Sequence, residues 1–305
     1  MSFVLTDFPE AFARPFRVSP LSAWLEYVPL APILIKLLQP RVFVELGTHA
    51  GDSYLAFCHA VRTLQTPTQC TAIDTWQGDA HTGVYGPEVL RDLKVVHDAN
   101  FAGFSRLLPS SFDAAAPGFA AGSIDLLHID GMHTYEAIRH DYQTWLPKLS
   151  PRGVVLLHDT AERKDDYGVW RLWEEIAPGK PSANIPYGHG LGILCVGAEV
   201  PAAFLDFLQA LNTDPNLVQA LQSLGAHVTR LNSFGNALRY QFQCQLFVNE
   251  WRQRTGQPLT AAPDFQSALA DPDAFGQSVV RDVRQLAQDA LNLAAEVMRL
   301  RSAKP

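Results

Sequence analysis

The sequence has few of the features that mark secreted, membrane or nucleic-acid-binding proteins. It holds only four cysteines in 305 residues, and their spacing shows no pairing, which favours a reducing, cytoplasmic environment. Its longest apolar stretch, Val28–Leu38, contains prolines and Lys36 and is too short to span a bilayer. The first residues lack the basic-then-apolar layout of a signal peptide. A formal net charge of −7 argues against electrostatic capture of nucleic acid.

The glycine pattern of dinucleotide-binding proteins, G-x-G-x-x-G, is also absent. In its place, the apolar run Val42–Val44 leads into Glu45, Gly47 and Gly51, and a helical pattern follows over Tyr54–Leu64. A strand, a glycine turn and a helix let backbone N–H groups approach a nucleotide-like ligand. An acid just before the loop would repel a pyrophosphate but suits a cation or an amine.

Short apolar runs alternate with helical patterns between residues 41 and about 197. Such alternation indicates an α/β fold, with a parallel sheet covered by helices on both faces. The expected strands are Arg41–Leu46, Thr71–Thr75, Arg106–Leu108, Ile124–Asp130, Val154–His158 and Leu191–Val196. Further helices are expected over Glu88–Phe101 and Thr134–Leu149.

Several of these strands end in polar residues, in the sequences VELGTH, AIDTW, LLHIDG and VVLLHDT. Ligands of open α/β sheets bind beyond the carboxyl ends of the strands, so these residues should meet in one cleft. Asp74, at the end of the second strand, can accept hydrogen bonds from both hydroxyls of a ribose. Together, Glu45 and Asp74 favour a donor such as S-adenosylmethionine, which carries a sulfonium, an amine and a ribose.

Residues 44–53, 72–86 and 124–160 resemble class I S-adenosylmethionine-dependent methyltransferases. More narrowly, they resemble the sugar and small-molecule O-methyltransferases related to macrocin O-methyltransferase and cephalosporin hydroxylase, of the variety associated with glycosyltransferases. The resemblance implies a Rossmann-like, seven-stranded sheet and methyl transfer to a sugar hydroxyl of a polysaccharide, glycoconjugate or glycosylated natural product. The implied donor-binding residues are Glu45, Gly47, Thr48, Gly51, Ser53, Asp74, Trp76, Ser111, Phe112 and Asp130.

Within that set the resemblance implies separate roles. Glu45 and the two glycines would line the methionine end of the donor, and Asp74 would bind the ribose. Trp76 would flank the adenine, with Ser111 and Phe112 at the adenine edge. Asp130 would lie close to the sulfonium.

Two acids and two histidines should gather where the fourth and fifth strands end. Asp130 and His133 lie three residues apart across a glycine turn, and His158 and Asp159 close the neighbouring strand. One interpretation makes His133 the general base that deprotonates the acceptor hydroxyl. The other makes Asp130, His158 and Asp159 ligands of a divalent metal such as Mg²⁺. Metal-dependent relatives carry two acids at the position of His158–Asp159, and imidazole suits softer metals than Mg²⁺.

Other features of this region have two interpretations each. Residues 81–86 form either a lid over the acceptor or a plain surface loop. Tyr167, Trp170 and Trp173 are spaced three residues apart, as on one face of a helix. This face either stacks on a sugar ring or packs against the sheet. His189 lies beside the last strand and is a candidate for the acceptor pocket. His128, by strand alternation, is expected to be structural.

The chain is expected to comprise an N-terminal helical cover (1–40), the donor-binding domain (41–199) and a helical extension (200–305). From Val279 to Leu300, apolar residues recur at alternating steps of four and three. This heptad seam favours either packing on its own domain or self-association and docking of a glycosyltransferase.

Three rival functions remain open at this point. They are a nicotinamide-dependent dehydrogenase or epimerase, a metal-dependent hydroxylase of the same architecture, and a non-catalytic subunit of a glycan assembly complex. The missing G-x-G-x-x-G disfavours the first rival.

Overall fold

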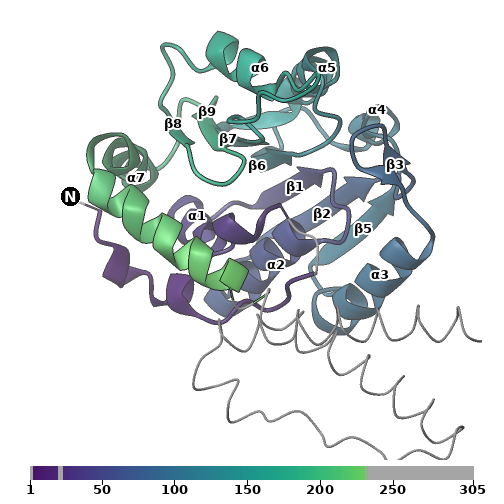
Figure 1. Cartoon of the computed structure of the whole chain (residues 1–305), viewed down its shortest axis with the longest axis horizontal. Coiled ribbons are helices and arrows are strands. Elements are labelled where there is room, and N and C mark those ends of the chain that lie inside the picture. The colour runs from purple at the N-terminus through teal and green to yellow at the C-terminus, as the bar shows by residue number, and fades with distance from the viewer. Residues whose placement is uncertain (1–2, 20–22, 231, 233–305) are drawn as a thin grey trace, which may run out of the picture. The chain divides into compact units, whose positions relative to one another are not determined.

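The computed structural model describes residues 3–19, 23–230 and 232 (Figure 1). Residues 1–229 cluster as one compact unit. The heptad pattern from Val279 to Leu300 and most of the expected helical extension lie outside the described residues. The expected division at residues 40 and 199 stays a prediction.

The centre of the fold is a seven-stranded sheet in the order β5-β2-β1-β6-β7-β9-β8. Its strands are β1 (Val42–Leu46), β2 (Gln69–Asp74), β5 (Ser105–Pro109), β6 (Ile124–Ile129), β7 (Leu149–His158), β8 (Ser182–Ile185) and β9 (Leu191–Cys195). The first five of these strands run parallel. β9 runs antiparallel to β7, and β8 antiparallel to β9, so the sheet is mixed rather than parallel throughout.

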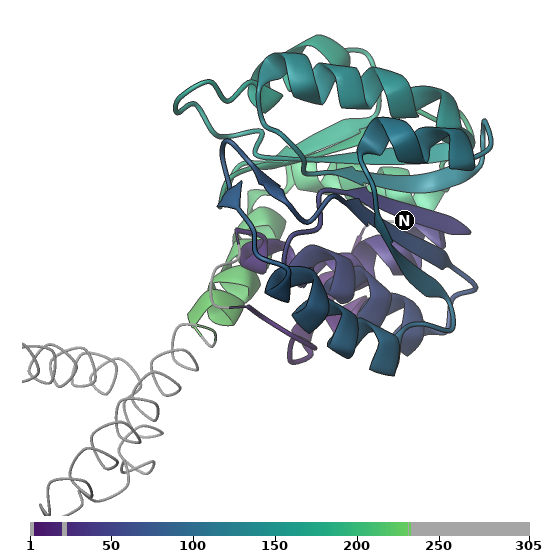
Figure 2. The same ribbon diagram turned by 90° about the vertical axis from the view of Figure 1, so that its right-hand side faces the viewer.

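Helices cover both faces of this sheet, as the two perpendicular views show (Figures 1 and 2). The α-helices are α1 (Leu30–Leu38), α2 (Asp52–Leu64), α3 (Glu88–Asn100), α4 (Phe112–Ala115), α5 (Tyr135–Trp145), α6 (Val169–Ile176) and α7 (Ala202–Thr213). Short 3₁₀ helices lie at Leu5–Asp7, Pro9–Phe12, Leu25–Tyr27, Ala116–Gly118 and Leu146–Lys148. A further helical segment spans residues 215–230.

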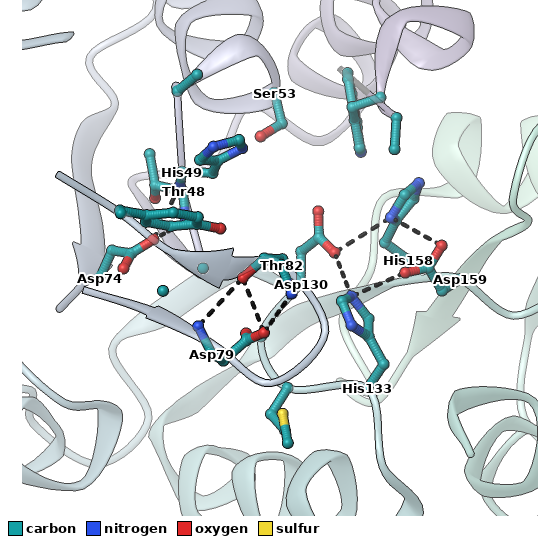
Figure 3. Close-up of a pocket in the computed structure, with 18 of the residues that line it drawn as sticks. Thr48, His49, Ser53, Asp74, Asp79, Thr82, Asp130, His133, His158 and Asp159 are labelled. Atoms are coloured by element: carbon teal, nitrogen blue, oxygen red, sulfur yellow. Dashed lines mark hydrogen bonds and ion pairs between the residues drawn. The ribbon is translucent and has the colours of Figure 1, made fainter. Parts of the chain in front are cut away.

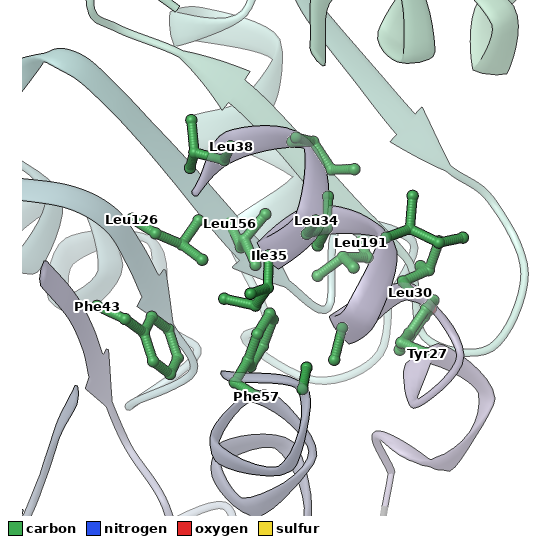
Figure 4. Close-up of a cluster of buried hydrophobic side chains, with 14 of the residues drawn as sticks. Tyr27, Leu30, Leu34, Ile35, Leu38, Phe43, Phe57, Leu126, Leu156 and Leu191 are labelled. Atoms are coloured by element: carbon green, nitrogen blue, oxygen red, sulfur yellow. The ribbon is translucent and has the colours of Figure 1, made fainter. Parts of the chain in front are cut away.

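Strand alternation divides the core into two hydrophobic clusters, one on each face of the sheet. Phe43, Leu126 and Leu156 pack with α1, α2 and α7 on one face (Figure 4). Their neighbours in sequence face the other side and pack with α4, α5 and α6; they are Val44, Leu127 and Leu157. Continuous apolar runs in β1, β6 and β7 are therefore the sequence signature of strands buried on both faces.

The expected Rossmann-like, seven-stranded sheet is confirmed. All six strands expected from the sequence are present within a few residues of their expected bounds. β8 and the two-residue strands β3 (Gly78–Asp79) and β4 (Gly83–Val84), which form a hairpin, were not expected. Among the described residues, no helix has the length and apolar character needed to cross a membrane.

Near the amino ends of the parallel strands, the buried carboxylate of Asp125 links the segment before β1 to the starts of β6 and β7. Asp125 is fully buried and accepts hydrogen bonds from the backbone N–H and the guanidinium of Arg41. The Ser150 hydroxyl also donates to it. Burial alone would raise the pKa of Asp125, but the bonds from Arg41 and Ser150 outweigh it and lower the pKa to about 2.

We therefore expect Asp125→Asn to reduce the free energy of unfolding at pH 7 by about 2 kcal/mol. Folding lowers the pKa of Asp125 from its ordinary value of 3.8. The carboxylate therefore contributes to the free energy of unfolding above pH 3.8, and this contribution is lost as the pH falls toward about 2. Urea unfolding should show that the free energies of unfolding of variant and wild type differ less at pH 3 than at pH 7. Asp92→Asn, in an exposed pair with Arg91, is the control and should change little. Equal effects of the two substitutions would contradict the prediction.

Candidate functional site

A cavity of about 430 Å³ opens at the carboxyl ends of β1, β2, β6 and β7. Its wall includes most of the residues that the sequence points to: Gly47, Thr48, Gly51, Ser53, Asp74, Ser111, Phe112, Asp130, His133, His158 and Asp159. Figure 3 shows Asp74 and Thr48 on one side, Asp130 in the middle, and His133, His158 and Asp159 on the other side. The strand ends thus converge as the α/β fold predicts.

The loop after β1 approaches β6 so closely that only glycine fits at its first turn. Gly47 has φ +82°, and a Cβ added there would lie 2.0 Å from the carbonyl oxygen of Asp130. Its N–H donates to the carbonyl of Ile73 at 2.9 Å. Gly51, with φ +85°, precedes the first residue of α2. The two glycines therefore set the shape of the cavity wall.

Asp74 holds this loop in place through its carboxylate. Oδ2 accepts hydrogen bonds from the N–H groups of Thr48 and His49 at 2.8 and 2.9 Å. Oδ1 accepts one from the N–H of Trp76 at 2.7 Å. Asp74 lines the cavity, so it is placed to meet a ligand, but most of its acceptor capacity already serves the loop.

Two of the expected donor-binding residues lie outside the cavity wall. Glu45 is fully buried, and its Oε2 pairs with Nδ1 of His128 at 2.9 Å. Burial raises the pKa of Glu45, although the bond from His128 opposes this. Trp76 is 4% exposed, and its indole N–H donates to the carbonyl of His49. Both side chains support the cavity from behind, and the expected structural role of His128 fits this pairing.

Four charged groups form a compact cluster at the right of Figure 3. Nε2 of His133 lies 2.9 Å from Oδ2 of Asp159 and 3.5 Å from Oδ1 of Asp130. Nδ1 of His158 lies 3.2 Å from the same Asp130 oxygen and 3.4 Å from Oδ1 of Asp159. The side chains come from the ends of the adjacent strands β6 and β7, as the sequence predicts.

The cluster shifts the pKa of each of its members. Burial would lower the pKa of both histidines, but the bonds and charges of Asp130 and Asp159 outweigh it, so the pKa is raised to about 9 for His133 and about 10 for His158. Burial would likewise raise the pKa of the two acids, but the histidines hold it well below its usual range. At pH 7 the cluster therefore contains two cations and two anions.

Oxygens of Asp130 and Asp159 and a nitrogen of His133 lie within 4.8 Å of one another, an arrangement that fits three ligands of one metal ion. This set shares its two acids with the expected metal site, but it includes His133 where the sequence pointed to His158. Nδ1 of His158 contacts both acids, whereas its Nε2 is buried without a hydrogen-bond partner among the described residues.

The β3–β4 hairpin and the segment before α6 complete the wall; residues 81–86 and Tyr167 were candidates from the sequence, whereas Asp79 was not. Asp79, Thr82 and Tyr85 line the cavity from the hairpin. Tyr167 stacks on the ring of His133 with centroids 4.8 Å apart, and on His81 at 4.7 Å. The only local signal for the hairpin is the Asp79–Thr82 turn, in which Oδ1 of Asp79 accepts three hydrogen bonds.

Comparison with known proteins agrees with this geometry. Residues 44–160 match a protein family described as a methyltransferase domain. The chain is also 44% identical over 205 residues to an uncharacterized protein of Sinorhizobium fredii named y4gI. This match covers 67% of the chain but only 22% of that relative, so the chain spans about a fifth of its length. Residues 44–160 are therefore similar to a methyltransferase domain.

Solved structures with a similar fold include two methyltransferases. The S-adenosylhomocysteine-bound enzyme PaMTH1 of Podospora anserina is 14% identical, with a TM-score of 0.44 over 63% of this chain and 86% of that one. The O-methyltransferase TomG of Streptomyces achromogenes, solved with S-adenosylmethionine, is 18% identical, with a TM-score of 0.42 over 63% and 89%. At these scores they add nothing to the description of the site.

The charge cluster makes the stability of the ligand-free protein dependent on pH. A histidine whose pKa is raised on folding stabilises the folded state. This stabilisation is fully present below pH 6.5, the pKa of the unfolded chain, and is lost as the pH rises through about 9 to 10. We expect the free energy of unfolding to fall by at least about 1 kcal/mol between pH 6.5 and pH 10, and to fall less in His158→Gln. Urea titrations at several pH values measure this, with the exposed His227→Gln as control. An equal decline in His158→Gln and wild type would contradict the assignment.

Proposed function

We propose that this protein transfers a methyl group from S-adenosylmethionine to a hydroxyl group, most specifically a sugar hydroxyl of a polysaccharide, glycoconjugate or glycosylated natural product. The proposal depends on the position of Asp130, an anion in the middle of the cavity. The glycine loop lies on one side of it and the charge cluster on the other. A sulfonium beside Asp130 would leave the methyl group facing His133, His158 and Asp159.

The donor half of the cavity supports this orientation. Gly47, Thr48 and Ser53 offer backbone and hydroxyl groups near the N-terminus of α2, where the methionine end would bind. Asp74 retains at least one lone pair for a ribose hydroxyl. Ser111 and Phe112 lie at the far wall, where an adenine would pack. Glu45 acts from behind the wall, through its charge rather than by contact.

In methyl transfer the reacting carbon is already activated, so the protein has to align the hydroxyl and accept its proton. Asp130 and His133 remain our proposed catalytic pair. With a pKa of about 9, His133 is protonated at pH 7 in the donor-free cavity. In this form it is a cation that aligns the acceptor, and a second cation bound beside Asp130 would offset the acid and lower that pKa. A divalent metal held by Asp130, Asp159 and a cluster histidine would supply such a charge and acidify the acceptor hydroxyl.

The sugar acceptor, a cytoplasmic location and a partner are further parts of the proposal. The aromatic faces of Tyr85 and Tyr167 in the cavity wall are surfaces on which a sugar ring can stack. The buried free thiols of Cys58, Cys70 and Cys195 fit a reducing compartment. Self-association or docking of a glycosyltransferase through the heptad residues stays a proposal, because those residues lie outside the described part of the chain.

Donor binding is tested by calorimetry with S-adenosylhomocysteine on wild type, Gly47→Ala and Gly122→Ala. Both glycines have positive φ, but a Cβ meets the Asp130 carbonyl at position 47 and nothing within 4 Å at position 122. We expect Gly47→Ala to weaken binding at least tenfold and Gly122→Ala to leave it within about twofold, since only the first change alters the cavity wall. Failure of the wild type to bind at millimolar ligand would refute the proposed donor.

The same preparation, incubated with S-adenosylmethionine and a panel of free sugars, nucleotide sugars and phenolic glycosides, identifies the reaction by product mass. A gain of ~14 Da indicates methylation, and ~16 Da would indicate the hydroxylase alternative. Binding of the donor without turnover of any acceptor would favour the non-catalytic alternative. A rate that survives dialysis against EDTA would refute the metal requirement.

His133→Ala should lower turnover at least tenfold while the affinity for S-adenosylhomocysteine stays within about twofold. The reason is that the substitution removes the cation between Asp130 and Asp159 and leaves two acids facing each other. Steady-state rates on the acceptor found above, together with calorimetry, separate the two effects. An unchanged rate would remove His133 from the mechanism.

A further inference from the structure

We propose that His189, oriented by Glu162, is the side chain that binds the acceptor hydroxyl and receives its proton. This inference rests on the proposed methyl transfer and names the proton acceptor of that same site. It comes from the imidazole of His189 in the cavity wall, which pairs with the carboxylate of Glu162 and is separate from the charge cluster.

The pair has the geometry of an oriented base. Nδ1 of His189 is hydrogen-bonded to Oε1 of Glu162, a residue 27 positions away in sequence. A carboxylate at this nitrogen favours the tautomer with the proton on Nδ1, and so leaves the lone pair on Nε2. Nε2 has no hydrogen-bond partner among the described residues, and the His189 side chain lines the cavity. Lys164, also in the wall, lies 3.5 Å from the second oxygen of Glu162.

The other histidines near the charge cluster are committed to contacts within the protein. His133 has both ring nitrogens engaged, Nε2 with Asp159 and Asp130, and Nδ1 at 3.3 Å from Nδ1 of His81. His158 is 2% exposed and turns Nδ1 toward the acids. His189 is 38% exposed in its side chain and so can meet a ligand without breaking a contact at Nε2.

Several independent contacts hold the backbone of His189 in this position. The carbonyl of His189 accepts a hydrogen bond from the N–H of Ala161 at 2.9 Å. The Tyr27 hydroxyl donates to the carbonyl of Tyr187 and accepts from the N–H of Gly190. Gly190 has φ +90°, and a Cβ there would lie 2.3 Å from the backbone nitrogen of Ala161. Contacts on both sides of His189 therefore fix the backbone of this loop.

The ring also lies beside the reacting centre. The centroids of His189 and His158 are 6.0 Å apart, and His158 contacts Asp130, next to which the sulfonium is proposed to bind. In the step itself, the acceptor oxygen forms a bond to the methyl carbon while the bond from that carbon to sulfur breaks. The hydroxyl proton moves to Nε2 of His189, and S-adenosylhomocysteine leaves as a neutral thioether.

The test compares His189→Gly, Glu162→Gln and the control His140→Gln in the full chain. His140 pairs with Asp113 on the surface and has the same imidazole–carboxylate contact outside the cavity. We expect kcat to fall about a hundredfold in His189→Gly and at least about tenfold in Glu162→Gln, with KM for S-adenosylmethionine unchanged. Added imidazole should restore at least a tenth of the lost rate to His189→Gly and none to His133→Ala, because only the first loses a proton acceptor.

A second measurement does not depend on turnover. Nitrogen-15 NMR of the histidine rings should show the Nδ1–H tautomer for His189 in the wild type and a shift toward the Nε2–H tautomer in Glu162→Gln. A dominant Nε2–H tautomer in the wild type would overturn the proposal. So would an unchanged kcat in His189→Gly while donor binding and methylation by the wild type are intact. If the wild type neither binds nor uses the donor, the proposed function fails and this inference fails with it.

Discussion

The paired charges of Asp130, Asp159, His133 and His158 are the interaction on which the site depends. Two buried carboxylates this close would repel each other strongly, and burial penalises each charge further. The two histidines compensate, which is why their pKa rises and that of the acids falls. The four-residue cluster is thus electrically balanced, and any cation bound there has to compete with a histidine for Asp130. Binding of a cation beside Asp130 would therefore be coupled to the protonation of the cluster.

The backbone frame around the cluster follows from the strand order. β1 lies between β2 and β6, so its loop can touch both neighbours: Gly47 approaches the carbonyl of Asp130, and the N–H groups of Thr48 and His49 bind Asp74. The loop after β1 thereby connects Asp74 to the charge cluster. The acid at the end of β1 itself, Glu45, is buried in the core, where it pairs with His128.

Most of the sheet could be predicted because its strands are buried on both faces and read as continuous apolar runs ending in polar residues. The same logic located Asp130, His158 and Asp159 correctly at one edge. It failed for β8 and for the hairpin, whose two-residue strands carry no periodic signal. It also could not distinguish a side chain facing the cavity from one behind it, because Glu45 and Trp76 sit in the same motifs as the residues that line the wall.

Long-range contacts explain the rest of what the sequence could not specify. The surroundings of His189 are assembled from Tyr27 in the N-terminal segment, Glu162 after β7 and the loop before β9, and none of these positions lies in a motif with the others. Their arrangement depends on the antiparallel return of β9 along β7, which brings the loop before β9 to the carboxyl end of β7. In a purely parallel sheet that loop would lie at the opposite edge. The antiparallel direction of β9 is therefore what places the imidazole of His189 next to that of His158.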